Sequence, residues 1–176
     1  VSFCFSFPGE GIFFGSTPER LVRLKNGFIH TEALAGTTSR GSNMEEDRVL
    51  SEFLLDSHKE REEHSLVLEQ ILRKLDPLTD DVQYSTAPQI MKLKNVQHLQ
   101  TPISGTLKGN ETVLDLVSKL HPTSAVAGTP TTEAMHLINK METHDRGWYS
   151  GPIGWIDGKG DGEFYVALRS ALVKDE

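Results

Sequence analysis

The stretch DSHKEREEHSLVLEQILRKL, residues 56–75, has the longest clean helical pattern in the chain. Followed towards the N-terminus, its apolar stripe runs into His64, Glu63 and Glu60. The pattern therefore places two carboxylates at the N-terminal end of the core-facing side of a helix. The stripe itself, with apolar residues three and four apart, consists of Val67, Leu68, Ile71, Leu72 and Leu75.

Two hypotheses account for these carboxylates. In the first, the stripe frays at residue 64, Asp56 or Ser57 caps the helix, and the carboxylates complement the positive end of the helix dipole. In the second, the carboxylates bind a hard divalent cation, because carboxylate oxygens and water suit Mg²⁺ and the sequence has no Cys or His cluster for a softer ion. The residues of this stretch alone leave both hypotheses open.

The composition is that of one globular domain. The 176 residues are 37% hydrophobic and 24% charged, which predicts a single domain over 1–176 with a real core. Lysine plus arginine number 18 against 25 acidic residues, and the net charge of −7 argues against a nucleic-acid partner or an anionic membrane surface. An anionic substrate would therefore need positive charge concentrated in an arginine or a metal ion.

Cysteine usage and hydropathy predict a cytoplasmic location. Cys4 is the only cysteine, which excludes an intrachain disulfide and a thiolate metal cluster and favours a reducing compartment. Because Cys4 stands in an apolar run, we expect it in the core. No apolar stretch reaches the length that spans a membrane, so we expect no membrane partner.

Strand and helix signals along the chain predict an α+β fold. Asn26-Gly27 is a hairpin signal, and the small residues of 32–37 either let backbone N–H groups approach a ligand or form a plain sheet-to-helix connection. We expect Thr129 to cap a helix whose first residue is Pro130. Strands are predicted over 2–7, 11–15, 21–24, 29–31, 89–99, 103–107, 153–156 and 163–173, and helices over 42–55, 56–75, 112–120 and 130–142.

Two further side chains have a functional interpretation beside a structural one. His98 ends its predicted strand, where a histidine usually makes a structural hydrogen bond. Arg169 is flanked by Ala167 and Ala171, which leave space around its guanidinium group. That arrangement fits a clamp on a carboxylate, and it also fits an arginine on a solvated face.

Seven segments, in order and over nearly the whole chain, resemble the chorismate-utilising enzymes, which are the isochorismate, salicylate, aminodeoxychorismate and anthranilate synthases. The segments are GSTPERLVRL, TEALAGT, DSHKEREEHSLV, VQHLQTPISG, HPTSAVAGTP, RGWYSGPIGW and GDGEFYVALRSA. Within the family, HPTSAVAGTP, RGWYSGPIGW and TEALAGT most resemble the menaquinone-pathway isochorismate synthases, and whether the product feeds menaquinone or a siderophore stays open. The resemblance implies an α+β fold of the anthranilate synthase component I type, with stacked antiparallel sheets surrounded by helices, and it implies chorismate and Mg²⁺ in a cleft beside the sheets.

The resemblance also implies roles for single residues. Glu19, which the residues alone identify only as part of a turn, matches the general acid that protonates the departing C4 hydroxyl. Glu63 matches a direct magnesium ligand, and Glu60 matches a residue that supports it. Ala125 stands where salicylate-forming relatives carry a threonine. Matches to substrate contacts are Gly36, Thr37, His98, Tyr149 and Arg169.

The chain departs from the family pattern at both ends. The family's general base is a lysine in a strand that would precede Val1, and its second magnesium glutamate would follow Glu176. We therefore expect residues 1–176 to be part of a chorismate-binding catalytic domain and to be inactive alone. The expected reaction of the whole protein is conversion of chorismate to isochorismate. Formation of salicylate, anthranilate or aminodeoxychorismate, or ligand binding without turnover, are the alternatives, and the oligomeric state stays open.

Overall fold

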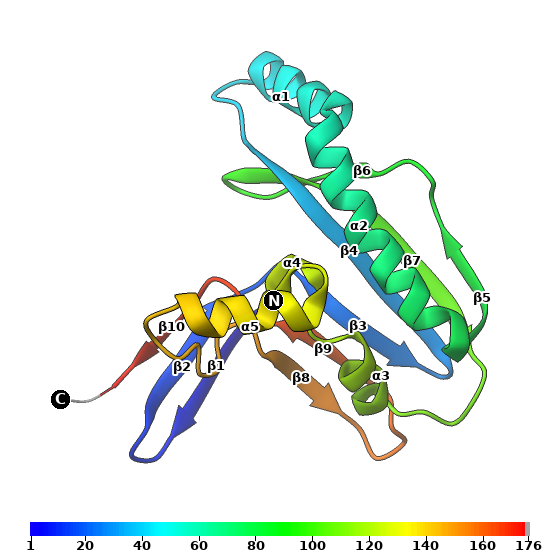
Figure 1. Ribbon diagram of the computed structural model, residues 1–176, viewed down its shortest axis with the longest axis vertical. Coiled ribbons are helices and arrows are strands. Elements are labelled where there is room, and N and C mark those ends of the chain that lie inside the picture. The colour runs from blue at the N-terminus through cyan, green and yellow to red at the C-terminus, as the bar shows by residue number, and fades with distance from the viewer. Residues whose placement is uncertain (175–176) are drawn as a thin grey trace.

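Two antiparallel sheets and the helices packed on them make up the fold, which is seen in a computed structural model that describes residues 1–174 (Figure 1). The smaller sheet has the strand order β1-β2-β10, and the larger has the order β5-β7-β4-β3-β9-β8, with β6 paired to β7. The strands are β1 (Ser2–Phe7), β2 (Gly11–Ser16), β3 (Arg20–Lys25), β4 (Phe28–Ser39), β5 (Thr79–Tyr84), β6 (Gln89–Lys92), β7 (Val96–Leu107), β8 (Pro152–Ile156), β9 (Gly162–Val166) and β10 (Ser170–Val173).

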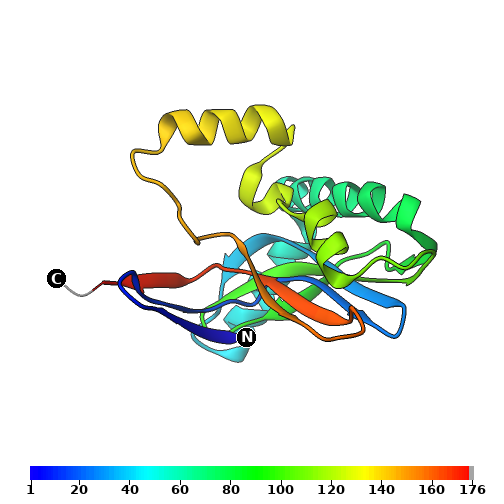
Figure 2. The same cartoon turned by 90° about the horizontal axis from the view of Figure 1, so that it is seen from below.

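The helices contribute very differently to the core. Helix α2 packs on β4 and β7, and α3 packs on β3 (Figure 1). Helix α5 stands away from the sheets and has no buried residue (Figure 2). The helices are α1 (Met44–Asp56), α2 (His58–Leu75), the 3₁₀ turn η1 (Asp76–Leu78), α3 (Val113–Leu120), α4 (Ser124–Ala127) and α5 (Thr131–Met141). None of the helices in the described part of the chain is both long and apolar enough to cross a membrane.

Helix α2 forms where the sequence predicts it, and its inward stripe continues beyond Val67. The Ser57 side chain caps it by accepting a hydrogen bond from the Glu60 N–H at 3.4 Å. His64 is only 3% exposed, as buried as the apolar residues that follow it. The stripe therefore does not fray at residue 64, so that part of the dipole hypothesis is wrong, whereas the predicted serine cap is present.

The β3–β4 hairpin follows the local turn chemistry. Asn26 and Gly27 both have positive φ, 52° and 78°, and Lys25 pairs with Phe28 across the turn. A two-residue turn with two positive φ angles matches the right-handed twist of the flanking strands, which is why Asn-Gly is favoured there. The hairpin prediction is confirmed.

Strand boundaries differ from the prediction in several places. The predicted strand 89–99 is two strands, because the chain turns back at Lys94 and Asn95, and β7 then runs through Pro102 instead of starting anew at 103. His98 therefore lies near the beginning of a strand, not at its end. The predicted strand 163–173 breaks at Arg169, whose φ of 50° sends β10 into the smaller sheet. Strand β5 was not predicted.

Three local expectations are also wrong. Cys4 is exposed, because β1 lies at the edge of the small sheet and this side chain meets no core. Residues 32–37 are not a sheet-to-helix connection but part of β4, which extends to Ser39. The cap of α5 is Pro130, one residue after the predicted Thr129, and it makes no side-chain capping bond.

Candidate active site

Glu19 is a buried carboxyl group in a largely apolar setting. It precedes β3 and is 9% exposed. A small cavity beside it is lined by polar residues of the neighbouring strands and by apolar side chains from α2, α3 and β4, the latter being Leu34, Val67, Ile71 and Leu120. Burial is the main cause that raises the pKa of Glu19 from 4.5 to about 7, and the negative charge of Glu32 contributes to this rise. At neutral pH the group can therefore hold a proton or release one, as a general acid must.

Thr123 is the hydrogen-bond partner of this acid. Its Oγ1 donates a long hydrogen bond to Glu19 Oε1, across 3.5 Å. This bond favours the charged carboxylate and so offsets part of the rise in the pKa of Glu19 that burial causes. Thr123 is itself 7% exposed and lies 104 residues away in sequence. We did not identify Thr123 from the sequence. Its place within HPTSAVAGTP is the signal that could have found it.

A bulge in β4 forms the second part of the site. The pairing of β4 with β7 shifts register between Ala35 and Thr37, which leaves Gly36 unpaired with φ at 80°. A Cβ on Gly36 would lie 3.2 Å from the backbone oxygen of Glu60, so this close approach of strand and helix needs glycine. The bulge turns the Thr37 N–H towards α2, where it donates to Glu60 Oε2 at 3.0 Å.

His98 lies opposite this bulge. Its Nδ1 is 2.8 Å from Thr37 Oγ1, and its Nε2 is buried and has no hydrogen-bond partner among the described residues. Burial, together with the charge of Arg169, lowers the pKa of His98. The structure thus brings His98 and Glu60 each into contact with Thr37, with the charge of Arg169 close to His98. An unpartnered buried nitrogen at such a place is available to a polar ligand.

His64 anchors α2 beneath this cluster. Its Nε2 is 2.8 Å from Thr101 Oγ1 and its Nδ1 is 3.2 Å from the Ala35 carbonyl oxygen. These two contacts fix the rotation of the helix next to Glu60 and Glu63. His64 is thus a structural residue that orients the two predicted metal carboxylates, a part that helical periodicity alone does not reveal.

The carboxylates of α2 fit a magnesium site in part. Glu60 is half-buried and its Oε2 already accepts from Thr37, which suits a supporting residue better than a direct ligand. Glu63 is exposed, so its predicted place on the core-facing side of the helix is wrong. It makes no hydrogen bond or ion pair with any residue that the structure describes, so both its oxygens can face an ion. No group of three or more acidic, histidine or cysteine side chains within residues 1–174 could hold a metal ion. Magnesium needs only one or two protein carboxylates, with water and substrate completing its octahedron, so Glu63 fits such a site.

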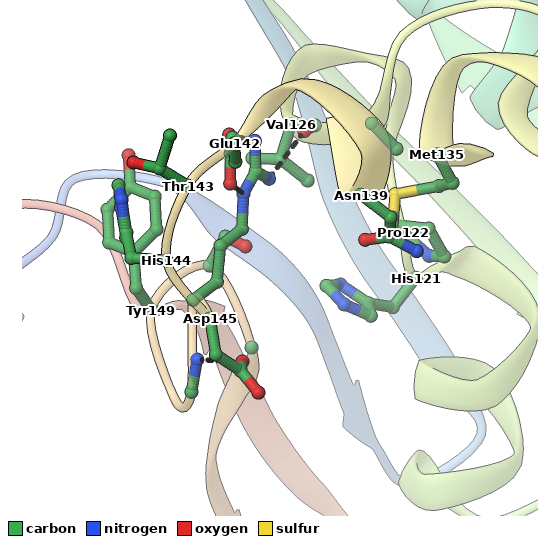
Figure 3. Close-up of a pocket in the computed structure, with 15 residues that line it drawn as sticks. His121, Pro122, Val126, Met135, Asn139, Glu142, Thr143, His144, Asp145 and Tyr149 are labelled. Atoms are coloured by element: carbon green, nitrogen blue, oxygen red, sulfur yellow. Dashed lines mark hydrogen bonds and ion pairs between the residues drawn. The ribbon is translucent and has the colours of Figure 1, made fainter. Parts of the chain in front are cut away.

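Tyr149 and Arg169 are close in the backbone but not paired through their side chains. Ser150 N–H donates to the Ala167 carbonyl at 3.0 Å, which joins the two segments. The guanidinium group over the Tyr149 ring is that of Arg146, 6.0 Å from the ring centre. Tyr149 lines a cavity of about 640 Å³ formed by α4, α5 and the segments 121–122 and 142–151 (Figure 3). The carboxylate clamp of Tyr149 and Arg169 therefore stays a prediction.

Ala125 lies on the short helix α4, two residues after Thr123, and is exposed.

The site has two parts, which lie at different points along β4. Glu32, whose charge acts on Glu19, precedes the bulge glycine by four residues, which corresponds to about 13 Å of strand. The two parts are the buried acid with Thr123 and the bulge with Glu60 and His98.

Comparison with known proteins gives a consistent result. The chain is 48% identical over 165 residues to the salicylate biosynthesis isochorismate synthase of Pseudomonas aeruginosa, covering 94% of this chain and 35% of that protein. Among solved structures, it is similar to the menaquinone-specific isochorismate synthase MenF of Escherichia coli, with a TM-score of 0.89 and 36% identity over 96% of this chain and 39% of that one. Anthranilate synthase component I of Streptococcus pneumoniae gives a TM-score of 0.85 at 29% identity, covering 97% of this chain and 37% of that one.

These similarities confirm the predicted α+β architecture of the anthranilate synthase component I type. The chain spans a little over a third of the length of each of these proteins. The family model described as chorismate binding enzyme matches residues 1–176, the whole chain. The chain therefore belongs to the chorismate-binding enzyme family.

Proposed function

We propose that these residues form part of the active site of a magnesium-dependent isochorismate synthase, with chorismate as substrate. The observation that carries the proposal is Glu19, a carboxyl group whose burial raises its pKa to about 7. Hydroxide is a poor leaving group, so loss of the C4 hydroxyl of chorismate needs an acid that is still protonated near neutral pH. An exposed glutamate with an ordinary pKa would be ionised there and could not supply the proton.

The proposed reaction is balanced by one water entering and one leaving. Water attacks C2 of the ring while a base takes one of its protons, the ring double bond shifts, and the C4–O bond breaks as Glu19 protonates the departing hydroxyl. We infer that the base is a lysine outside residues 1–176, so these residues alone do not turn over chorismate. Glu63 would hold Mg²⁺ with Glu60 in support, and the ion would neutralise the ring carboxylate.

The remaining site residues supply substrate contacts in this proposal. The buried Nε2 of His98 has no hydrogen-bond partner within residues 1–174 and can interact with the ring carboxylate, beside Thr37 and the bulge at Gly36. Tyr149 and Arg169 would bind the enolpyruvyl carboxylate. The assignments of Gly36, Thr37 and His98 take support from the cluster that the fold assembles around β4. Those of Tyr149 and Arg169 take support from the family membership of the chain.

Two residue patterns favour isochorismate as the product over the family alternatives. Ala125 replaces the threonine of salicylate-forming relatives, and Glu32-Ala33-Leu34 differs from the proline-containing version found before AGT in ammonia-using relatives. The family resemblance of HPTSAVAGTP makes menaquinone synthesis the pathway hypothesis, and the single cysteine makes the cytoplasm the compartment hypothesis.

Chromatography of the products formed by the whole protein from chorismate and Mg²⁺ tests the proposal. We expect isochorismate as the main product. Salicylate, or anthranilate when ammonia is supplied, would overturn the product assignment, and binding of chorismate with no product would favour a non-catalytic binding protein.

A further inference from the structure

Two side chains of α2, one helical turn apart, form hydrogen bonds with the segment 120–131, which begins at the end of α3. Gln70 Oε1 accepts from the Ser124 N–H at 2.7 Å, and Gln70 Nε2 donates to Thr131 Oγ1 at 3.1 Å. Lys74 Nζ donates to the carbonyl oxygens of Leu120 and Pro122, at 2.9 and 3.2 Å. We call Gln70 and Lys74 the α2 clamp. It fixes both ends of the segment and both chain neighbours of Thr123.

Thr123 is the residue that this segment presents to the acid. Its carbonyl oxygen accepts from the N–H groups of Val126 and Ala127, so its backbone is fixed by the first turn of α4. Its hydroxyl donates to Glu19 Oε1. A bond of 3.5 Å is at the outer limit for this pair, and a small displacement of the segment would break it.

The other groups around Glu19 do not stabilise its charged form. On β4 the facing charge is the carboxylate of Glu32, which disfavours ionisation. The guanidinium group of Arg20, next along the chain, is turned to Glu163 at 2.7 Å instead. The side chains that α2 and α3 place beside the acid are apolar: Val67, Ile71 and Leu120. Among the described residues, Thr123 alone donates a hydrogen bond to the Glu19 carboxyl group.

We propose that Gln70 and Lys74 are positioning residues for the general acid, because they hold Pro122 and Ser124 and thereby keep the Thr123 hydroxyl on the Glu19 carboxyl group. The proposal rests on the proposed function, in which Glu19 is the acid. Gln70 follows Glu63 by seven residues, two helical turns along the same side of α2. One rigid helix therefore fixes the metal end of the site and the acid end relative to each other.

The pH dependence of kcat in the whole protein tests this role. The Thr123 bond favours the charged form of Glu19, so its loss raises the pKa of the acid. We expect Thr123→Val and Gln70→Leu each to move the basic limb of the profile upwards, by roughly half a unit or more. Thr123→Ser keeps the hydroxyl and should leave the limb in place. Glu69 is the exposed neighbour of Gln70, and Glu69→Gln is the matched control, which should also leave the basic limb unshifted.

The double variant Thr123→Val/Gln70→Leu shows whether Gln70 acts on the pKa of Glu19 through Thr123 or independently of it. If Gln70 acts through Thr123, the double variant shifts the limb no further than Thr123→Val alone. A shift equal to the sum of the two single shifts would overturn the proposal. An unshifted Gln70→Leu beside a shifted Thr123→Val would also overturn it.

A carboxyl ¹³C titration of Glu19 makes the test independent of the reaction. The signal is assigned by its loss in Glu19→Gln, and its midpoint should rise in Gln70→Leu as in Thr123→Val. This result would support the clamp even if the whole protein formed another product, so failure of the proposed function and failure of the clamp remain distinguishable. If Gln70→Leu does not fold, Gln70→Asn, whose shorter side chain cannot span both partners, serves in its place with the same expected direction.

Discussion

The backbone N–H of Thr37 donates a hydrogen bond to Oε2 of Glu60 at 3.0 Å, which joins the bulge of β4 to the first turn of α2. Removing the acceptor with Glu60→Ala should lower the free energy of unfolding by about 1 kcal/mol and raise the KM for chorismate, because the bulge loses its support. Glu60→Gln keeps an acceptor oxygen and should retain most of the stability. Urea unfolding and initial-rate kinetics of the two variants measure both effects. Equal stability of Glu60→Ala and the wild type would show that the bond does not hold the bulge.

Glu63 differs from Glu60 in having no partner among the described residues. Glu63→Gln should leave the unfolding free energy within about 0.5 kcal/mol of the wild type, as for other exposed positions. The substitution should instead weaken magnesium binding, because a neutral amide binds this hard cation poorly. The Mg²⁺ concentration that gives half-maximal activity should rise about 10-fold or more. Activity measured against Mg²⁺ concentration checks this. The neighbouring exposed Glu62→Gln is the control, and an unchanged Mg²⁺ requirement in Glu63→Gln would remove this residue from the metal site.

Helical periodicity is local, and that is why the sequence could predict part of the site. Glu60, His64 and Val67 share a face of α2 because neighbours three and four apart lie together on any helix. The Asn26-Gly27 hairpin is equally local. The bond between Thr123 and Glu19 joins residues 104 apart, and no pattern within either segment encodes it. The β4 bulge also escaped prediction, because small residues around Gly36 fit a loop as well as a bulged strand.

The same reasoning explains the strand errors. Pro102 and the run from Gln89 to Leu99 favour one strand before the proline and another after it, yet β7 continues through Pro102, which pairs opposite Glu32. Alternation of apolar residues from 163 to 173 predicts one strand, but the positive φ of Arg169 redirects the chain. In both segments the strand boundaries are set by pairing with strands distant in sequence, β4 for β7 and β2 for β10.

His64 is the most consequential structural residue next to the metal carboxylates. His64→Ala would leave the Thr101 hydroxyl and the Ala35 carbonyl without their partner and would open a cavity at a buried position. We expect a loss of roughly 2–4 kcal/mol in the free energy of unfolding. Glu63→Ala, one residue away but exposed, is the matched comparison and should cost far less. A midpoint of urea unfolding for His64→Ala that matches that of Glu63→Ala would contradict the anchoring role.

The raised pKa of Glu19 has a consequence for stability. The unfolded chain ionises this group near 4.5, whereas the folded chain holds the proton until about 7. The stability from the protonated carboxyl group is therefore fully present below pH 4.5 and is lost as the pH rises through 7. The difference between the two pKa values corresponds to roughly 3 kcal/mol.

Glu19→Gln removes this titration. The variant should be more stable than the wild type above pH 7, by up to roughly 3 kcal/mol, and the difference should shrink towards zero near pH 4. Unfolding free energies at both pH values measure it. A difference that is the same at pH 4 and pH 8 would mean that the pKa of Glu19 is not raised.

Steady-state kinetics of Glu19→Gln in the whole protein, with chorismate binding measured in parallel, test the assignment of the general acid most directly. The amide keeps the shape of the carboxyl group but cannot donate the proton that the C4 oxygen must receive. We expect turnover to be abolished while the dissociation constant for chorismate stays close to that of the wild type. A variant that retains its kcat would contradict the assignment of Glu19 as the acid.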